Sequence, residues 1–172
     1  MTNTYNSMMG NDESNTLVGT VSDDFINGCE GADVITGKGG NDFIIGSDGA
    51  DQYTYSALPA SGVPEGYHEG VDAIIDFTRS EGDKIDLSAL SSVTDGGLTF
   101  TGTTATPYAA YYSSGVNSIY SPVVPGSDWE WILPPDNRLT LKVDLDGNAQ
   151  DEPELMALIW GVNTLTSADF IF

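Results

Sequence analysis

Aspartate and glycine recur every nine residues in the first third of this chain. Four consecutive units, GTVSDDFIN, GCEGADVIT, GKGGNDFII and GSDGADQYT, follow one another without insertion from residue 19 to residue 54. Each unit opens with glycine, carries aspartate at its sixth position and has a large apolar or aromatic residue at its eighth. A fixed period of this kind is the signature of a solenoid, in which each repeat buries its apolar face only by stacking on its neighbours.

The length of the unit predicts its local structure. Nine residues divide into a loop of about six and a strand of about three, so two units complete one coil and each loop stacks on the loop two units later. Glycine at the first and fourth positions is expected to let the loop adopt positive φ. The sequence therefore predicts an all-β fold that begins as a parallel β-roll, or β-solenoid. The eighth-position side chains expected to form its thin core are Leu17, Ile26, Ile35, Ile44 and Tyr53.

The stacked aspartates predict a row of calcium sites. Calcium takes roughly six to eight oxygen ligands at about 2.3–2.6 Å, from carboxylates and main-chain carbonyls. With loops stacked two units apart, Asp24 faces Asp42 at one edge of the roll, and Asp33 faces Asp51 at the other. Carboxylates stacked in this way repel each other unless a cation lies between them. The residues whose carbonyls are expected to complete the sites are Gly19, Val21, Gly28, Glu30, Gly37, Gly39, Gly40, Gly46, Asp48 and Gly49.

A weaker unit, GNDESNTLV, precedes the four clear ones from Gly10. Asn15 stands where the other units have aspartate, and Glu13 stands where most have glycine. An amide oxygen can coordinate a cation but brings no charge, so we expect the site that Asn15 shares with Asp33 to be weak. The five units predict roughly three calcium ions or more.

The charge of the chain excludes several classes of partner. With 26 acidic and 5 basic residues, the formal net charge is −21 at pH 7. Such a chain could not neutralise phosphates, so nucleic acid, anionic membrane surfaces and polyanionic substrates are excluded as partners. Roughly three divalent cations would bring the charge to about −15. Because self-repulsion of this size opposes compaction, we expect the chain to become compact only when cations bind.

Other features of the chain bear on its compartment. Cys29 is the single cysteine, so an internal disulfide is excluded. The start of the chain, MTNTYNSMMGNDESN, has neither a basic nor an apolar region, so no cleaved N-terminal signal peptide is expected. No stretch has the length and apolar character needed to span a bilayer, and membrane insertion is not expected.

The predicted organisation is an N-terminal tail at 1–9, the roll at 10–54 and a β-rich part at 55–172, all in one continuous domain. In the last part, RLTLKVDLDGN followed by ELMALIWGV predicts a hairpin that turns at Asp146–Gly147. The DLDGN sequence also has the residues that open an EF-hand loop, but the glycine and glutamate needed later in such a loop are missing, so a hairpin turn is favoured. Residues 151–158 are compatible with one or two helical turns or with the return strand.

From residue 10 onward the chain resembles the RTX C-terminal domain found in serralysin-type proteases and in the R-modules of alginate epimerases. The resemblance implies a calcium-bound parallel β-roll followed by an antiparallel β-sheet. It also implies that Asp72 is a ligand of the last calcium site, with help from Glu65 or Glu69. The segment 105–137 departs from the family because it is longer and more aromatic. The matching residues are the repeats, DAIIDF at 72–77, GDKIDLS at 82–88, the LKVDLDGN hairpin and the terminal DFIF.

The resemblance further implies a secreted bacterial protein that leaves the cell through a type I exporter. In that family the export signal is uncleaved, lies at the C-terminus and often ends in an acidic residue followed by apolar ones, as residues 169–172 do. Inside the cell, where calcium is scarce, the repeats are expected to stay disordered, and extracellular calcium is expected to fold them. The leading prediction is a small secreted calcium-binding RTX protein, found outside the cell or at its surface.

No enzymatic activity is expected. The catalytic domains of the RTX relatives precede their repeats, and only nine residues precede the repeats here. A zinc protease needs two histidines on one helical face, and His68 is the single histidine.

Two other functions stay open. Little sequence precedes the roll to cap its first coil, which favours calcium-dependent self-association into a surface or matrix protein. The aromatic segment 108–131 could instead bind a neutral glycan, although its aromatic residues could equally cover the core of the sheet. The residues expected to contact such a partner are Tyr111, Tyr112, Trp129 and Trp131.

Overall fold

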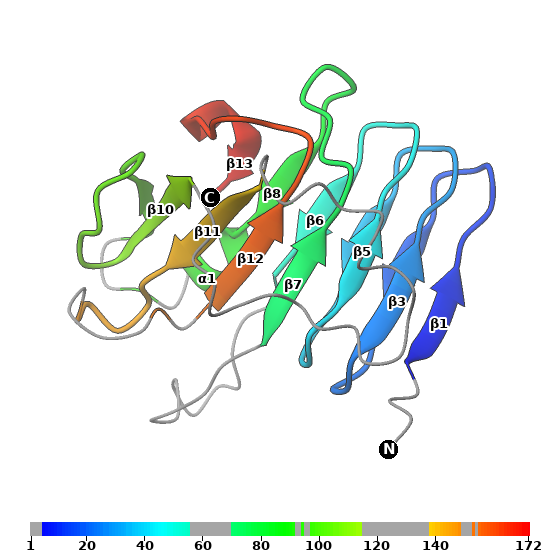
Figure 1. Cartoon of the computed structure of the whole chain (residues 1–172), viewed down its shortest axis with the longest axis horizontal. Coiled ribbons are helices and arrows are strands. Elements are labelled where there is room, and N and C mark those ends of the chain that lie inside the picture. The colour runs from blue at the N-terminus through cyan, green and yellow to red at the C-terminus, as the bar shows by residue number, and fades with distance from the viewer. Residues whose placement is uncertain are drawn as a thin grey trace.

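The computed structural model describes residues 5–55, 70–91, 94, 97–114, 138–148, 153 and 155–172 of the chain. Among these residues the strands form two sheets (Figure 1). Sheet A has eight strands in the order β1-β3-β5-β7-β12-β11-β10-β9, and sheet B has five in the order β13-β8-β6-β4-β2. The helical elements of this part are short, namely α1 (Ser88–Ser91) and the 3₁₀ turn η2 (Ser167–Asp169). The prediction of an all-β fold is confirmed.

Strands β1 to β8 alternate between the two sheets and form the roll. Each strand pairs in parallel with the strand two steps later, so two units complete one coil, as the nine-residue period predicts. Figure 1 shows the sheet A strands of the roll side by side. They are β1 (Asn6–Met9), β3 (Asp24–Asn27), β5 (Phe43–Ile45) and β7 (Val71–Ile74); sheet B contributes β2 (Thr16–Val18), β4 (Val34–Thr36), β6 (Gln52–Thr54) and β8 (Lys84–Asp86).

The eighth-position residues lie inside the roll, as expected. Ile26 pairs with Ile44, and Ile35 pairs on one side with Leu17 and on the other with Tyr53. All five are buried and belong to a single core cluster that continues into the C-terminal part. The alternation of strand residues therefore places one apolar residue per unit in the core and leaves the loops at the two edges.

The roll extends beyond the repeats in both directions. Residues 6–9, expected to lie in an N-terminal tail, form strand β1, with Asn6 opposite Asp24. The tail prediction was wrong there because this segment keeps the strand register of the repeats, although it has neither their glycine nor their aspartate. At the other end, β7 and β8 continue the two sheets, so that Ile74 lies opposite Ile44 and Ile85 lies opposite Tyr53.

The C-terminal part continues sheet A and closes sheet B. Its sheet A strands are β9 (Thr99–Phe100), β10 (Ala109–Ser114), β11 (Leu139–Val143) and β12 (Leu155–Ile159), and β13 (Phe170–Ile171) is the edge strand of sheet B. Strand β12 is parallel to β7 and antiparallel to β11, and β11 is antiparallel to β10. Strands β11 and β12 are therefore the two arms of the predicted hairpin, but Val143 lies opposite Leu155, so residues 144–154 connect them and the prediction of a tight hairpin turn at Asp146–Gly147 was wrong. No helix in the described ranges is long and apolar enough to cross a membrane.

The DLDGN sequence forms a turn, as favoured by the sequence. Asp144 Oδ1 accepts hydrogen bonds from the N–H groups of Gly147 at 2.7 Å and Tyr108 at 3.2 Å. Asp146 Oδ1 accepts one from the N–H of Asn148 at 2.7 Å. Gly147 has a φ of 84°, which glycine adopts at no steric cost. These carboxylates thus cap main-chain donors of the turn.

Candidate metal centre

The loops of the roll stack at its two edges. The connections from sheet A to sheet B, at 10–15, 28–33, 46–51 and 75–83, form the first edge. The connections 19–23 and 37–42, which run from sheet B to sheet A, form the second edge. Because every second strand belongs to the same sheet, loops two units apart lie on one another, and the sixth-position aspartates come together in two rows.

The sixth-position carboxylates of Asp33, Asp42 and Asp51 are each tied to the main chain of the residue at the same position two units earlier. Asp42 Oδ1 accepts a hydrogen bond from the N–H of Asp24 at 2.9 Å. The corresponding bonds run from Asn15 to Asp33 at 2.7 Å and from Asp33 to Asp51 at 2.9 Å. We call each such pair a rung. The rungs Asn15–Asp33, Asp24–Asp42 and Asp33–Asp51 are the stacked pairs expected from the sequence.

Two further rungs extend the rows beyond the repeats. Asp72 Oδ1 accepts the N–H of Asp42 at 3.1 Å, and Asp83 Oδ1 accepts the N–H of Asp51 at 3.0 Å. Asp72 thus continues the second row, and the expectation that it binds calcium stays a prediction, whereas the place of Asp83 in the first row was missed. Its signal was present in the sequence, because Asp83 precedes Ile85 by two residues as every sixth-position aspartate precedes its inward apolar residue. Glu65, Glu69 and His68 lie outside the described residues.

Three carboxylate oxygens in these rows are buried without a hydrogen-bond donor. They are Oδ2 of Asp33, Asp42 and Asp51. A buried anionic oxygen without a donor or a cation is costly, so each of these atoms fits a cation ligand. Oδ2 of Asp24 differs, since the N–H of Thr20 donates to it at 2.5 Å. Oδ2 of Asp83 likewise accepts the N–H of Thr78 at 2.7 Å.

The glycines of the loop have two different roles. Gly31, Gly40 and Gly49 at the fourth position have φ of 112°, 109° and 148°, as expected. The expectation of positive φ at the first position was wrong. There glycine is required for space, because a Cβ on Gly28 or Gly37 would lie closer than 3.0 Å to Oδ2 of the aspartate in the same unit.

The second position takes the left-handed conformation that was expected of the first. Cys29, Lys38 and Ser47 have φ of 74°, 75° and 72°. In the units from Gly28, Gly37 and Gly46, the loop therefore has a positive φ at both its second and its fourth position. Neither the unit from Gly10 nor the unit from Gly19 has a positive φ in its loop. Those two loops are held by side chains instead.

In the first unit, the side-chain oxygen of Asn15 is poorly placed to bind a cation. Asn15 Oδ1 accepts the N–H of Asn11 at 2.7 Å, and Asn11 Oδ1 accepts the N–H of Glu13 at 2.9 Å. The amide oxygen expected to coordinate is therefore already hydrogen-bonded. In the rung Asn15–Asp33, only Asp33 can therefore offer a cation a charged oxygen ligand.

The remaining predicted ligands could act only through their main-chain carbonyls. The side chains of Val21, Glu30 and Asp48 are exposed, Val21 to 83%. Stacking brings carbonyls toward the next loop, since Asp48 O accepts the N–H of Gly31 at 2.9 Å. A Cβ on Gly19 would meet Gly37 O at 2.5 Å. The other carbonyls predicted to coordinate belong to Gly28, Gly39, Gly40, Gly46 and Gly49, all in these stacked loops.

Burial sets the protonation of the rungs when no cation is present. Loss of water raises the pKa of Asp42 and of Asp51 to about 7, more than their hydrogen bonds from Asp24 and Asp33 lower it. Burial likewise raises the pKa of Asp33. A divalent cation beside these carboxylates would favour their charged form. Within the described ranges no three acidic, His or Cys side chains cluster tightly enough to hold a metal by themselves, so a bound ion would need main-chain carbonyls.

The predicted aromatic contact residues are only partly within the described structure. Tyr111 and Tyr112 are half-buried on β10. Tyr112 stacks on Phe100 with ring centroids 6.2 Å apart and an interplanar angle of 5°. Trp129 and Trp131 lie outside the described residues. The proposal that this segment binds a glycan stays a prediction.

Comparison with known families and structures bears on the repeats. Residues 9–44 and 30–57 match the RTX calcium-binding nonapeptide repeat. No curated protein matches the chain. The chain is similar to the solution structure of the AlgE6R2 subunit of the Azotobacter vinelandii mannuronan C5-epimerase, with 23% identity over 96% of this chain and 91% of that one and a TM-score of 0.47. The AlgE6R3 subunit of the same epimerase gives 22% identity over 95% and 80%, with a TM-score of 0.30.

Proposed function

We propose that the protein is a secreted bacterial calcium-binding module whose roll folds when extracellular calcium fills its rungs. The match of residues 9–44 and 30–57 to the RTX calcium-binding nonapeptide repeat supports this. The observation that supports this most directly is the set of buried, donorless Oδ2 atoms on Asp33, Asp42 and Asp51. Such oxygens suit a hard cation that prefers carboxylates and carbonyls.

We assign one calcium ion to each of the rungs Asn15–Asp33, Asp24–Asp42 and Asp33–Asp51. The carboxylate of the later residue supplies a charged ligand in each case, and carbonyls of the stacked loops supply the rest. The Asn15–Asp33 rung is the weakest of the three because its amide oxygen is neutral and already hydrogen-bonded. At the Asp51–Asp83 rung, Asp83 Oδ2 has a main-chain donor, so this rung is not assigned an ion.

Calcium bound with the affinity of extracellular modules would determine whether the roll is folded. Extracellular modules bind with dissociation constants of about 10⁻⁴ to 10⁻³ M. At about ten times the dissociation constant, each filled site stabilises the folded state by ~1.4 kcal/mol, and three such sites by about 4 kcal/mol. That is a large share of the roughly 5–15 kcal/mol by which a domain is stable. Without calcium, the net charge of −21 opposes compaction.

This dependence would suit export through a type I system. At intracellular calcium the sites would be empty, and the Gly- and Asp-rich repeats would remain extended enough to pass through the exporter. Calcium outside the cell would then supply the free energy of folding.

The test is a calcium titration of the full chain, followed by circular dichroism, with bound calcium measured on the same samples. We expect β structure to appear cooperatively on addition of calcium and to be lost on addition of chelator. Asp33→Asn should shift the calcium midpoint upward by about tenfold, or ~1.4 kcal/mol, because Asp33 belongs to two of the assigned rungs. The matched control is Asp12→Asn, the same change at an exposed position of the first unit. A spectrum that chelator leaves unchanged would refute the proposal.

Self-association is a second candidate function, favoured by where the exposed apolar side chains lie. Among the described residues, the large exposed ones are Met9, Val18, Val21, Ile171 and Phe172. Val18 is on β2 and Ile171 on β13, which are the two opposite edge strands of sheet B. Such edges can pair head to tail between copies. Light scattering at millimolar calcium tests this: particles that grow with calcium and disappear in Val18→Lys support it, and a strict monomer refutes it.

A further inference from the structure

The C-terminal segment, residues 164–171, lies on the end of the first edge, where the row of rungs stops. Strand β13 pairs in parallel with β8, placing Phe170 opposite Ile85. Counting back from this pair, Ala168 falls opposite Asp83 and Asp169 falls opposite Lys84. The position that would continue the aspartate row is therefore alanine. The segment lacks a carboxylate where an ion of the row would need one.

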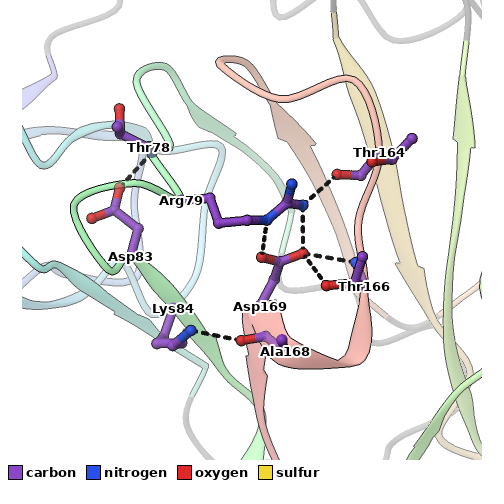
Figure 2. Close-up of polar contacts among 8 residues, drawn as sticks. All are labelled: Thr78, Arg79, Asp83, Lys84, Thr164, Thr166, Ala168 and Asp169. Carbon is purple, nitrogen blue, oxygen red and sulfur yellow. Dashed lines mark hydrogen bonds and ion pairs between the residues drawn. The ribbon is translucent and has the colours of Figure 1, made fainter.

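The basic side chains of Arg79 and Lys84 connect loop 75–83 and β8 to the C-terminal segment (Figure 2). The guanidinium of Arg79 donates from Nε to Asp169 Oδ1 at 2.6 Å and from Nη2 to Asp169 Oδ2 at 2.7 Å. The same Nη2 donates to the carbonyl of Thr164 at 2.8 Å. Lys84 Nζ donates to the carbonyl of Ala168 at 2.6 Å. In the earlier rungs, carboxylates and main-chain carbonyls are the ligand types assigned to calcium. Here the same two types of group bind the positively charged side chains of Arg79 and Lys84.

The loop that carries Arg79 is held by its own hydrogen bonds. Thr78 donates its N–H to Asp83 Oδ2 at 2.7 Å and its hydroxyl to the carbonyl of Asp76 at 2.8 Å. The N–H of Glu81 donates to the carbonyl of Thr78 at 3.0 Å. Oδ2 of Asp83 is thus satisfied, in contrast to the donorless Oδ2 atoms of Asp33, Asp42 and Asp51. The loop needs no metal to position Arg79.

Asp169 depends on these donors for its charge. It is fully buried, and besides Arg79 it accepts the N–H of Thr166 at 2.7 Å and the hydroxyl of Thr166 at 3.0 Å. A buried carboxylate is stable only when it is paired and hydrogen-bonded. Arginine is permanently charged and matches a carboxylate with two parallel donors, so this compensation is present at any calcium concentration.

We propose that Arg79, assisted by Lys84, takes the place at the end of the first edge that metal ions take in the earlier rungs, and so holds the C-terminal segment on the roll without calcium. The chain then has two parts with different calcium dependence. The loops of residues 28–54 order only when their rungs are filled, whereas β8 and the C-terminal segment stay joined in the presence of chelator. Loop 75–83 thus binds the C-terminal segment of the same chain through Arg79.

Amide hydrogen exchange of the full chain, read by mass spectrometry in calcium and in chelator, tests this proposal. The reporters are peptides from residues 28–54 and 160–172. The second peptide contains the N–H of Asp169, which is bonded to Thr166 O. The N–H of Leu87, which is bonded to Ile171 O, reports the same junction in a third peptide that covers residue 87. We expect wild-type protection in 160–172 to change by less than about threefold between calcium and chelator, while Arg79→Gln exchanges there about tenfold faster in both.

The matched control is Lys142→Gln, which removes a positive charge from β11, a strand that neighbours neither β8 nor β13. It should leave exchange in 160–172 unchanged. The double variant Arg79→Gln/Asp169→Asn should recover most of the lost protection, because neutralising Asp169 removes the uncompensated buried charge. If Arg79→Gln lowers protection only because packing is lost, adding Asp169→Asn will not restore it. A double variant that exchanges as fast as Arg79→Gln would therefore overturn the proposal. So would wild-type protection in 160–172 that disappears in chelator.

The two proposals fail separately in this experiment. If exchange in 28–54 does not respond to calcium, the calcium switch is refuted, yet the comparison of wild type with Arg79→Gln in chelator still decides the role of Arg79. If 28–54 responds and Arg79→Gln behaves as wild type, the role of Arg79 is refuted and the calcium switch stands.

Discussion

Gly28 offers the sharpest test of how the loops hold calcium. A Cβ at this position would lie closer than 3.0 Å to Asp33 Oδ2 and 2.8 Å from the carbonyl oxygen of Gly46. Its φ lies outside the left-handed region, so Gly28→Ala adds a methyl group without backbone strain. The change should displace the carboxylate of Asp33. Gly39→Ala is the matched control, since its Cβ would be 3.7 Å from the nearest atom, Val21 Cα.

The magnitude follows from two terms. Overpacking at a tight site costs about 1–3 kcal/mol whether or not calcium is present. Displacing Asp33 also weakens the rungs Asn15–Asp33 and Asp33–Asp51, and each filled site is worth ~1.4 kcal/mol at about ten times its dissociation constant. In calcium, Gly28→Ala should therefore lower the free energy of unfolding by roughly 4–6 kcal/mol, of which about 3 kcal/mol depends on calcium.

Urea unfolding at several fixed calcium concentrations separates the two terms. The calcium-dependent part is the change in unfolding free energy between the lowest calcium concentration at which the protein is folded and a saturating one, compared among wild type, Gly28→Ala and Gly39→Ala. Gly39→Ala should keep the wild-type calcium response. If Gly28→Ala keeps it as well, the first-position glycine does not make room for a ligand, and the account of the loop given above is refuted.

Three further outcomes are expected. In calcium-free protein, the raised pKa values of Asp42 and Asp51, about 7 in the folded state, mean that the fold binds more protons than the unfolded chain between roughly pH 4 and 7. In calcium-free buffer, more of the roll should therefore be folded at pH 5 than at pH 8, whereas in saturating calcium proton competition makes its stability rise with pH; circular dichroism without calcium and urea midpoints in calcium measure this, and calcium-free β structure that increases with pH contradicts it. Lys38→Val should cost about 1–2 kcal/mol in thermal unfolding and Lys38→Gly should not, because Lys38 has a φ of 75°; equal melting temperatures would contradict this. Tyr53→Phe, which removes a buried hydroxyl 3.4 Å from Asp76 Oδ1, should cost at most about 1 kcal/mol and leave calcium stoichiometry unchanged; a lost ion would place Asp76 among the ligands.

The repeats could be predicted well from the sequence because their structure is periodic. The step of nine residues determines which residues point inward, which loops stack and which aspartates share a rung. Ile26, Ile35 and Ile44 are buried, and Asp24 hydrogen-bonds to Asp42 as their spacing predicts. Even Asp83 could have been found, since it keeps the spacing to an inward apolar residue that every repeat has.

The misleading features were those that depend on local crowding. Positive φ was expected at the first-position glycines, but the chain adopts it at the second and fourth positions instead. The first position needs glycine because an aspartate oxygen folds back against it. From the sequence alone, a glycine required for lack of space looks the same as a glycine required for its positive φ. Strand β1 was missed because pairing with β3, not its own composition, makes residues 6–9 a strand.

The sequence by itself determined that this chain forms an all-β roll with rows of aspartates along its edges, because a strict period repeats the same local geometry in every coil. The tertiary structure alone decided which buried carboxylates lack a hydrogen-bond donor and which are satisfied. Asp33, Asp42 and Asp51 keep a bare buried oxygen, whereas Asp169 is paired with Arg79, ninety residues away in the chain. Such a pairing follows from the docking of β13 on β8, and contacts of that separation leave no periodic signal in a sequence.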